Sequence, residues 1–294
     1  MRFIPAKTIV TRTTSGDSWF GHDYNMNIYK GCCHGCIYCD SRSECYHVDN
    51  FDEVRAKENS LNIIERELKS KRKKGIIGTG AMSDPYNPFE KEYELTREAL
   101  KLISKYGYGI STVTKSSLIT RDIDLYEKIK AYSPVSPKLT ITTFDDELCK
   151  KLEPNVTISS RRFKAVQQLA EAGIYTGILM TPILPFINDT EKNISNIVYA
   201  ALDSGAKFIY ASMGVTLRQN QRDYFYSKLD DLFPDMKQRY IRTFGDSYNC
   251  ISPQANKLWE GFTSLCEKYK IIYKMPQIIH GYKNVKTETQ LSLF

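Results

Sequence analysis

The chain has 294 residues, of which 41% are hydrophobic and 26% charged, the composition of a globular protein whose size suits a single α/β barrel domain. No apolar run approaches membrane-spanning length and the N-terminus lacks the apolar stretch of a signal peptide, so we expect a cytoplasmic protein whose eight cysteines are thiols or metal ligands. The 41 Lys and Arg exceed the 34 Asp and Glu, which permits an anionic partner such as nucleic acid but does not require one.

Apolar, β-branched runs alternate with helical stretches through the first two thirds of the chain. The runs are residues 25–29, 75–79, 109–114, 138–143, 175–181 and 207–212. Apolar residues recur at helical spacing in 60–73 and 161–172, and Gly173 follows the second of these segments as a C-cap would. Repeated βα units of this kind predict a parallel sheet.

The alternation of strands and helices ends at about residue 214, where an aromatic-rich helical region, a short strand at 271–273 and a polar tail follow. We therefore divide the chain into an N-terminal segment (1–24), a core of six βα units (25–213) and a C-terminal helical extension and tail (214–294). Ligands of parallel α/β folds bind at the carboxyl ends of the strands. The loops expected there contain the cysteines, then Ser83 to Tyr86, then Lys115 to Ser117, and finally the residues after Thr142.

Four cysteines occur between positions 32 and 39, directly after the first expected strand. Thiolates at this density in a reducing compartment indicate an iron–sulfur cluster or zinc. Cys33, Cys36 and Cys39 have ferredoxin spacing, but the fourth cysteine and the proline of that motif are missing. Cys32, Cys36 and Cys39 give C-x3-C-x2-C, and three ligands would leave one iron of a [4Fe–4S] cluster open. We choose this second register.

The competing interpretation is a zinc site that takes its fourth ligand from Cys45 or His34. Zinc ribbons and knuckles use two paired knuckles, whereas this sequence has one. We regard Cys33 and Cys45 as bystanders.

The C-x3-C-x2-C motif, with Tyr38 before its last cysteine, resembles the signature of the radical S-adenosylmethionine superfamily. Further blocks resemble its spore photoproduct lyase-like branch. They are Gly78-Thr79, Asp84-Pro85-Tyr86-Asn87-Pro88 with Glu90, Thr114-Lys115-Ser116, Leu152-Glu153-Pro154, Ala172-Gly173, Pro182-Ile183-Leu184-Pro185 and Asn188-Asp189. The resemblance implies a partial (β/α)6 TIM-type barrel. It also implies an enzyme whose cluster, reduced by a donor such as flavodoxin or ferredoxin, cleaves S-adenosylmethionine to a 5′-deoxyadenosyl radical.

By the same resemblance, Lys115 pairs with the carboxylate of S-adenosylmethionine and Thr142 contacts the same ligand. Tyr38 is expected to approach the adenine through its backbone, and Ser83 and Asp84 to line the neighbouring loop. These five residues are our candidates for cofactor binding.

One departure concerns the hydrogen-atom donor. The family's lyases carry a cysteine two to three residues before the aspartate, whereas residues 80–84 here contain no thiol. Reversal of thymine dimers by that route is therefore in doubt. Tyr86, Cys149 and Cys250 are candidates for the missing role, although burial among apolar side chains is the more common state of such cysteines.

The last five residues, Gln290-Leu291-Ser292-Leu293-Phe294, look like the peptide by which bacterial repair proteins bind the replicative sliding clamp. The alternative is a final strand packed on the body of the protein. The basic run at 69–74 suits a helix end, and the aromatic and basic residues at 218–226 suit either a nucleic-acid contact or a packed lid.

Together these features favour radical chemistry on nucleic acid, in repair or modification. Two alternatives stay open: the same chemistry on a peptide or small molecule, and a non-catalytic iron–sulfur protein recruited to the clamp.

Overall fold

The computed structural model describes residues 1–13 and 19–284. Its centre is a seven-stranded sheet in the order β10-β9-β8-β7-β6-β3-β2. The strands are β2 (Val10–Arg12), β3 (Tyr24–Met26), β6 (Ile76–Thr79), β7 (Gly109–Thr114), β8 (Lys138–Thr140), β9 (Gly177–Met180) and β10 (Phe208–Ala211). All neighbours from β3 to β10 pair in parallel, and β2 pairs antiparallel with β3 at one edge. The predicted partial (β/α)6 barrel is confirmed.

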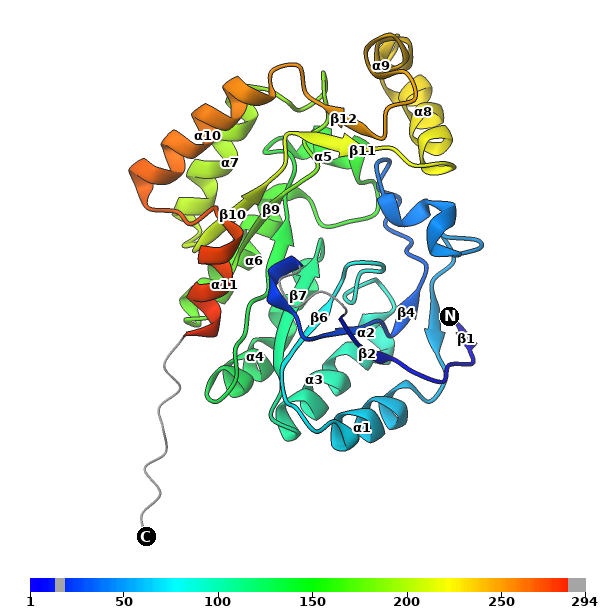
Figure 1. Ribbon diagram of the computed structural model, residues 1–294, viewed down its shortest axis with the longest axis vertical. Helices are drawn as coiled ribbons and strands as arrows, with labels where there is room; N and C mark the ends of the chain where they lie inside the picture. The colour runs from blue at the N-terminus through cyan, green and yellow to red at the C-terminus, as the bar shows by residue number, and fades with distance from the viewer. Residues whose placement is uncertain (14–18, 285–294) are drawn as a thin grey trace.

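Helices connect these strands and cover the outer side of the sheet (Figure 1). They are α1 (Ser60–Ser70), α2 (Glu90–Tyr93), α3 (Leu95–Lys105), α4 (Ile123–Lys130), α5 (Asp146–Leu152), α6 (Ser159–Glu171) and α7 (Glu191–Asp203), with the 3-10 turn η4 (Ser117–Asp122) before α4. Gly173 has a φ of +66° and donates its N–H to Ala170 O over 2.9 Å. It therefore ends α6 as predicted, in a conformation that favours glycine.

The first predicted strand is divided in two. Its first part is β3, whereas β4 (Tyr29–Lys30) leaves the barrel and joins β5 (Arg55–Lys57) and β1 (Arg2–Ile4) in a separate three-stranded sheet. The cysteine loop fills residues 31–54 between β4 and β5, and it includes the 3-10 turns η2 (Asp40–Arg42) and η3 (Glu44–Tyr46). Gly31 has a φ of +81°, and a Cβ there would lie 2.4 Å from Glu53 O. Glycine at this position lets the two ends of the loop meet.

The C-terminal extension begins with β11 (Gly214–Thr216), which pairs antiparallel with β12 (Asn249–Ile251). Between these strands come α8 (Gln221–Leu232) and α9 (Met236–Phe244). After them, α10 (Ala255–Tyr269) packs on α7, and α11 (Met275–Lys283) packs on the 3-10 turn η1 (Trp19–Gly21). The strand expected at 271–273 is a single bridge from Ile272 to Phe208. No helix among the described residues is long and apolar enough to span a bilayer.

An apolar cluster separate from the main core holds the cysteine loop in place. The main core lies between the sheet and its outer helices. A second cluster joins Cys36, Ile37 and Tyr38 of the loop to Phe225 of α8 and Tyr240 of α9. The C-terminal extension therefore packs directly against the segment that carries the cysteines.

Candidate active site

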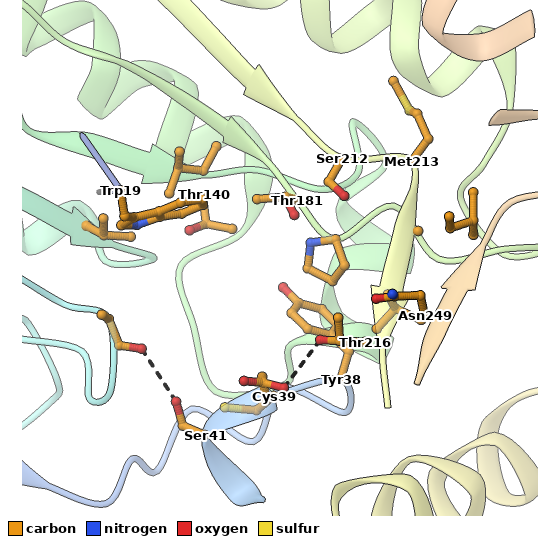
Figure 2. Close-up of a pocket in the computed structure, with 18 of the residues that line it drawn as sticks. Trp19, Tyr38, Cys39, Ser41, Thr140, Thr181, Ser212, Met213, Thr216 and Asn249 are labelled. Carbon is orange, nitrogen blue, oxygen red and sulfur yellow. Dashed lines mark hydrogen bonds between the residues drawn. The ribbon is translucent and has the colours of Figure 1, made fainter. Parts of the chain in front are cut away.

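A cavity of about 760 Å³ opens at the carboxyl ends of the parallel strands. One wall is the cysteine loop, with Tyr38 and Cys39, and the floor includes the ends of β6 to β10. A further wall comes from β11, β12 and the start of α10, and its Thr216 donates to Asp40 of the cysteine loop, so that residues far apart in sequence line one space (Figure 2). This is the place where ligands of parallel α/β folds bind.

The three predicted cluster ligands lie together in the loop. Cys32 and Cys36 are buried, and Cys39 is half-buried and lines the cavity. Burial, and then the charge of Asp84, raise the pKa of Cys32 to about 12. Burial also raises the pKa of Cys36, as do Glu153 and its neighbours Cys39 and Cys32. The thiols are therefore protonated in the metal-free protein, and binding of iron requires that they release their protons.

Cys33, Cys45 and His34 occupy different surroundings. Burial and the carboxylates of Asp84 and Asp52 raise the pKa of Cys33. Cys45 is exposed, and its sulfur lies 3.8 Å from a guanidinium nitrogen of Arg218. His34 Nδ1 lies 3.5 Å from Asp84 Oδ2. Within residues 1–13 and 19–284, no three His, Cys, Asp or Glu side chains converge tightly enough to hold a single metal ion. Cysteines that each bind a different iron of a cluster need not converge in that way.

A buried polar network lies behind the cysteine loop. The phenol of Tyr38 donates to Glu153 Oε1, and the guanidinium of Arg162 donates to Glu153 Oε2. Arg162 also donates to Thr140 O over 2.7 Å. Burial opposes ionisation of Glu153, but the charges of Arg162 and Lys115 outweigh it and hold the pKa of this carboxyl below its ordinary value. The network fixes the ring of Tyr38 against the cavity.

Lys115 brings a positive charge to the cavity. Its Nζ lies 5.6 Å from the centre of the Tyr38 ring. Burial alone would lower its pKa, but electrostatic interactions with Cys36 and with the carboxylate of Glu153 raise it. Within the described part of the chain, no hydrogen bond or ion pair engages this ammonium group. Lys115 is thus a cation at the cavity that no carboxylate of the described residues pairs with at ion-pair distance.

Ser83 and Asp84 lie behind the cavity and do not line it. Ser83 Oγ donates to Gly31 O over 2.5 Å, which ties the second loop to the cysteine loop. Asp84 Oδ2 accepts the backbone N–H of Lys115, and its Oδ1 accepts from Thr114 and from the N–H of Tyr86. The protein itself therefore occupies both carboxylate oxygens, and Asp84 acts on the site by positioning Lys115.

Tyr38 and Thr142, the other two candidates for cofactor binding, differ in their position relative to the cavity. The ring of Tyr38 lines it, while its carbonyl accepts from Gln221 Nε2 over 3.0 Å. Thr142 lies beyond the lining, which includes Thr140 instead, and its buried Oγ1 has no hydrogen-bond partner in the described part of the chain. Gly80 lines the cavity with a φ of +97°, and a Cβ there would lie 1.9 Å from Val113 O, so only glycine lets this loop lie so close to β7.

The three candidates for the hydrogen-atom donor do not line the cavity. Tyr86 is buried and shares a 3.0 Å hydrogen bond with the hydroxyl of Tyr126. Cys149 lies within reach of Glu153 and Arg162 in the buried network. Cys250 is buried in the second apolar cluster, the more common state of a cysteine outside a reactive site.

Several lining residues gave no signal in the sequence. Trp19 comes from the N-terminal segment, and Asn249, Asn256 and Trp259 come from the C-terminal extension. Their position depends on the pairing of β11 with β12 and on the packing of α10. Of the aromatic stretch at 218–226, Phe225 and Tyr226 are buried, as in a packed lid. The clamp-like segment, Gln290 to Phe294, lies outside the described residues.

Two curated relatives are described as uncharacterized proteins. An uncharacterized protein of Methanocaldococcus jannaschii is 37% identical over 174 residues, 58% of this chain and 64% of that protein. The chain thus spans slightly less than two thirds of that relative's length. An uncharacterized protein of Mycobacterium tuberculosis is 25% identical over 255 residues, 84% of this chain and 75% of its own length.

Solved structures with the same fold include spore photoproduct lyase complexed with dinucleoside spore photoproduct. It matches with a TM-score of 0.65 and 14% identity, over 91% of this chain and 79% of that one. A radical S-adenosylmethionine methyltransferase from Kitasatospora setae, with tryptophan substrate and an S-adenosylmethionine analogue bound, matches with a TM-score of 0.54 and 12% identity, over 83% of this chain and 51% of that one. The family model described as the Radical SAM superfamily matches residues 26–197, more than half of the chain. The chain belongs to the radical S-adenosylmethionine superfamily and has the same fold as spore photoproduct lyase.

Proposed function

We propose that the chain binds a [4Fe–4S] cluster through Cys32, Cys36 and Cys39 and uses it to modify or repair nucleic acid. One observation carries the proposal: the cysteine loop and the ammonium group of Lys115 meet at one cavity, at the carboxyl ends of the parallel strands. Family membership implies S-adenosylmethionine and an iron–sulfur cluster. The type of cluster and its ligands are our inference from the spacing of the three thiols.

The residues present fit these groups. Three buried or half-buried thiols supply soft ligands, and Lys115 supplies a cation for the carboxylate of S-adenosylmethionine. Gly80 lets the loop after β6 lie close to β7 at the edge of the cavity. When bound, the cluster supplies the electron that cleaves S-adenosylmethionine and generates a 5′-deoxyadenosyl radical.

The chain's own task is to orient the cofactor and to exclude water. Tyr38, fixed by Glu153, forms one side of the cavity that would hold the cofactor. The carboxylate of Asp84 holds the backbone of Lys115, and so sets the direction from which the ammonium group reaches the ligand. These contacts are made within the protein itself, which reduces the entropy cost of ordering the site.

Nucleic acid is the substrate class that we favour. The solved lyase that shares this fold was complexed with a dinucleoside photoproduct, and the match covers 91% of the present chain. A net charge of +7 suits a polyanion. We propose the cytoplasm as the location, a flavodoxin or ferredoxin as electron donor, and the sliding clamp as a partner through residues 290–294. Because residues 80–84 contain no thiol, we propose that hydrogen return differs from the cysteine route of the lyases.

The decisive experiment is anaerobic reconstitution followed by reaction with deuterated oligonucleotides. We expect cleavage of S-adenosylmethionine and transfer of deuterium into 5′-deoxyadenosine. Cleavage without transfer from any oligonucleotide would favour a peptide or small-molecule substrate. A reduced, cluster-loaded protein that neither binds nor cleaves S-adenosylmethionine would support the non-catalytic alternative.

A further inference from the structure

The sequence contains two tryptophans, and both line the cavity. Trp19 belongs to η1 and Trp259 to α10, yet each leaves a similar fraction of its surface exposed, 42% and 40%. Exposed tryptophan is uncommon on a protein surface, and two such rings at one cavity indicate a binding function.

Other aromatic rings hold each tryptophan in place. Trp19 meets Phe20 and Tyr210 edge to face, with ring centres 5.1 and 5.0 Å apart. Trp259 meets Phe262 at 5.4 Å and Tyr273 at 6.2 Å. Two rigid partners for each indole restrict its rotamers, so that the remaining exposed surface is already oriented before a ligand arrives.

Both tryptophans lie at the β10 edge of the barrel. Tyr210 belongs to β10, and Tyr273 follows Ile272, which bridges to Phe208 of the same strand. The two indoles therefore mark the side of the cavity at the last parallel strand. Figure 2 shows Trp19 beside Thr140 in the same cavity that has Tyr38 and Cys39 at the cysteine loop.

Away from Trp19, in Figure 2 beside Thr216, the cavity is lined by polar side chains that carry no charge. Asn249 of β12 and Asn256 of α10 line the cavity, and neither side-chain amide has a hydrogen-bond partner in the described part of the chain. The charged residues in the lining are Lys115, from the end of β7, and Asp40. Asp40 belongs to the cysteine loop, where it pairs with Arg218 at 3.1 Å.

Strand alternation explains why Asn249 lies in the cavity. Neighbouring side chains of a strand point to opposite faces, so Asn249 and Ile251 line the cavity while Cys250 between them is buried in the second apolar cluster. The backbone of Ser252 donates to Met213 O over 2.9 Å and keeps the register at the end of β12. A shift by one residue would put the thiol in the cavity and the amide in the core.

We propose that this cavity binds flat, uncharged heteroaromatic rings of the substrate, the chemistry of nucleobases. Trp19 and Trp259 supply stacking surfaces, which attract any such ring. The amides of Asn249 and Asn256 offer both a donor and an acceptor, the pattern that base edges require. The inference deepens the proposed function and rests on it, since it names the part of nucleic acid that enters the site.

The test compares two ligands on the reconstituted holoenzyme with S-adenosylmethionine: thymidylyl-thymidine, and an abasic dinucleotide with the same sugars and phosphate. Calorimetry should show that the parent protein binds the dinucleotide at least tenfold more tightly. Trp19→Ala and Trp259→Ala should each reduce that affinity about tenfold, as expected for loss of one stacked base. Trp19→Phe and Trp259→Phe should keep most of it, and no variant should change the affinity for the abasic ligand.

Tyr199→Ala is the matched control, because Tyr199 is also 42% exposed and packs edge to face on Tyr269, outside the cavity lining. It should bind both ligands like the parent. Equal affinity of the parent for the two ligands, or equal losses for both in the alanine variants, would overturn the proposal. Cleavage of S-adenosylmethionine by the parent is measured separately. Base binding without cleavage would refute the proposed function but not the base-binding site. Cleavage without a preference for the ligand that carries bases would refute the base-binding site but not radical chemistry.

Discussion

The carboxylate of Asp84 accepts the backbone N–H of Lys115 over 2.8 Å, which links the loop after β6 to the end of β7. The same carboxylate accepts the hydroxyl of Thr114 at 2.6 Å. The resemblance placed Asp84 near the cofactor, but its side chain acts one step away from it. Two neighbouring strands therefore present their loops to the cavity as one unit.

Replacing Asp84 with Asn tests this positioning role. The NH2 group of Asn cannot accept a hydrogen bond, so one of the groups that now donate to the carboxylate would lose its acceptor. The free energy of unfolding should therefore fall by about 1 to 3 kcal/mol. Urea denaturation measures that change. Asp124→Asn is the control, because Asp124 pairs with Arg97 at the surface and should cost about 0.5 kcal/mol or less. Equal stabilities of the two variants would contradict the positioning role.

Replacing Lys115 with Ala should weaken binding of S-adenosylmethionine by about 1 to 3 kcal/mol, the usual cost of losing a charge-assisted hydrogen bond. Iron and sulfide content should stay unchanged, because no thiol is altered. Titration of the reduced protein measures the affinity. Lys91→Ala, an exposed lysine outside this cavity, should bind the cofactor normally. Unchanged affinity in Lys115→Ala would remove this residue from the site.

The cysteine assignment predicts different outcomes for neighbouring thiols. Cys32→Ala, Cys36→Ala and Cys39→Ala should each lose iron and activity, because an iron that lacks its protein ligand dissociates or is oxidised. Cys33→Ala and Cys45→Ala should keep both. Iron and sulfide analysis after anaerobic reconstitution decides the point. A full complement in Cys36→Ala would refute the register, and loss in Cys45→Ala would favour the zinc-type arrangement.

Local patterns predicted the fold well. The β-branched runs located all six parallel strands, because strands buried on both faces need apolar residues throughout. The first run was wrong in its extent, since Tyr29 pairs with Ala56 in another sheet. Nothing in the sequence around Tyr29 shows that it pairs with β5 and not with a strand of the barrel.

Spacing within one loop is enough to propose Cys32, Cys36 and Cys39 as cluster ligands, and that assignment stays a prediction. The rest of the cavity lining was not predictable from the sequence, because distant segments meet there. The hydrogen bond from Tyr38 to Glu153 joins residues 115 positions apart. The contribution of Asn249 depends on the register of β12 against β11, and that of Trp259 on how α10 packs. Such contacts follow from tertiary packing, which no motif encodes.

The clamp-binding hypothesis rests on sequence alone, because residues 290–294 lie outside the described residues. Replacing Leu293 and Phe294 together with Ala should abolish binding to the clamp, since loss of a buried anchor costs about 2 kcal/mol or more, roughly a thirtyfold change in affinity. Thr287→Ala with Thr289→Ala is the control in the adjoining polar stretch. If these residues instead form a packed strand, the first double variant should melt at a much lower temperature, and the parent should show no affinity for the clamp.

The last prediction concerns Lys138, which is fully buried at the start of β8. Its Nζ donates to Ser111 Oγ over 2.5 Å and lies 4.2 Å from the centre of the Phe20 ring. Among the described residues no carboxylate forms an ion pair with it, and burial lowers its pKa to about 7. In the unfolded chain a lysine keeps its proton up to about pH 10.4.

Between pH 7 and this higher value, the unfolded state therefore binds one more proton at this residue than the folded state. Stability then rises with pH, by up to about 1.4 kcal/mol per pH unit from this group. Lys138→Met keeps the length of the side chain and removes the charge, so it should stabilise the protein near pH 7 and abolish this part of the pH dependence. Urea denaturation at pH 7 and pH 9 measures both effects, with exposed Lys164→Met as the control. Equal pH dependence in the parent and in Lys138→Met would show that the buried ammonium group keeps its charge, because a protonated lysine in both states contributes no slope.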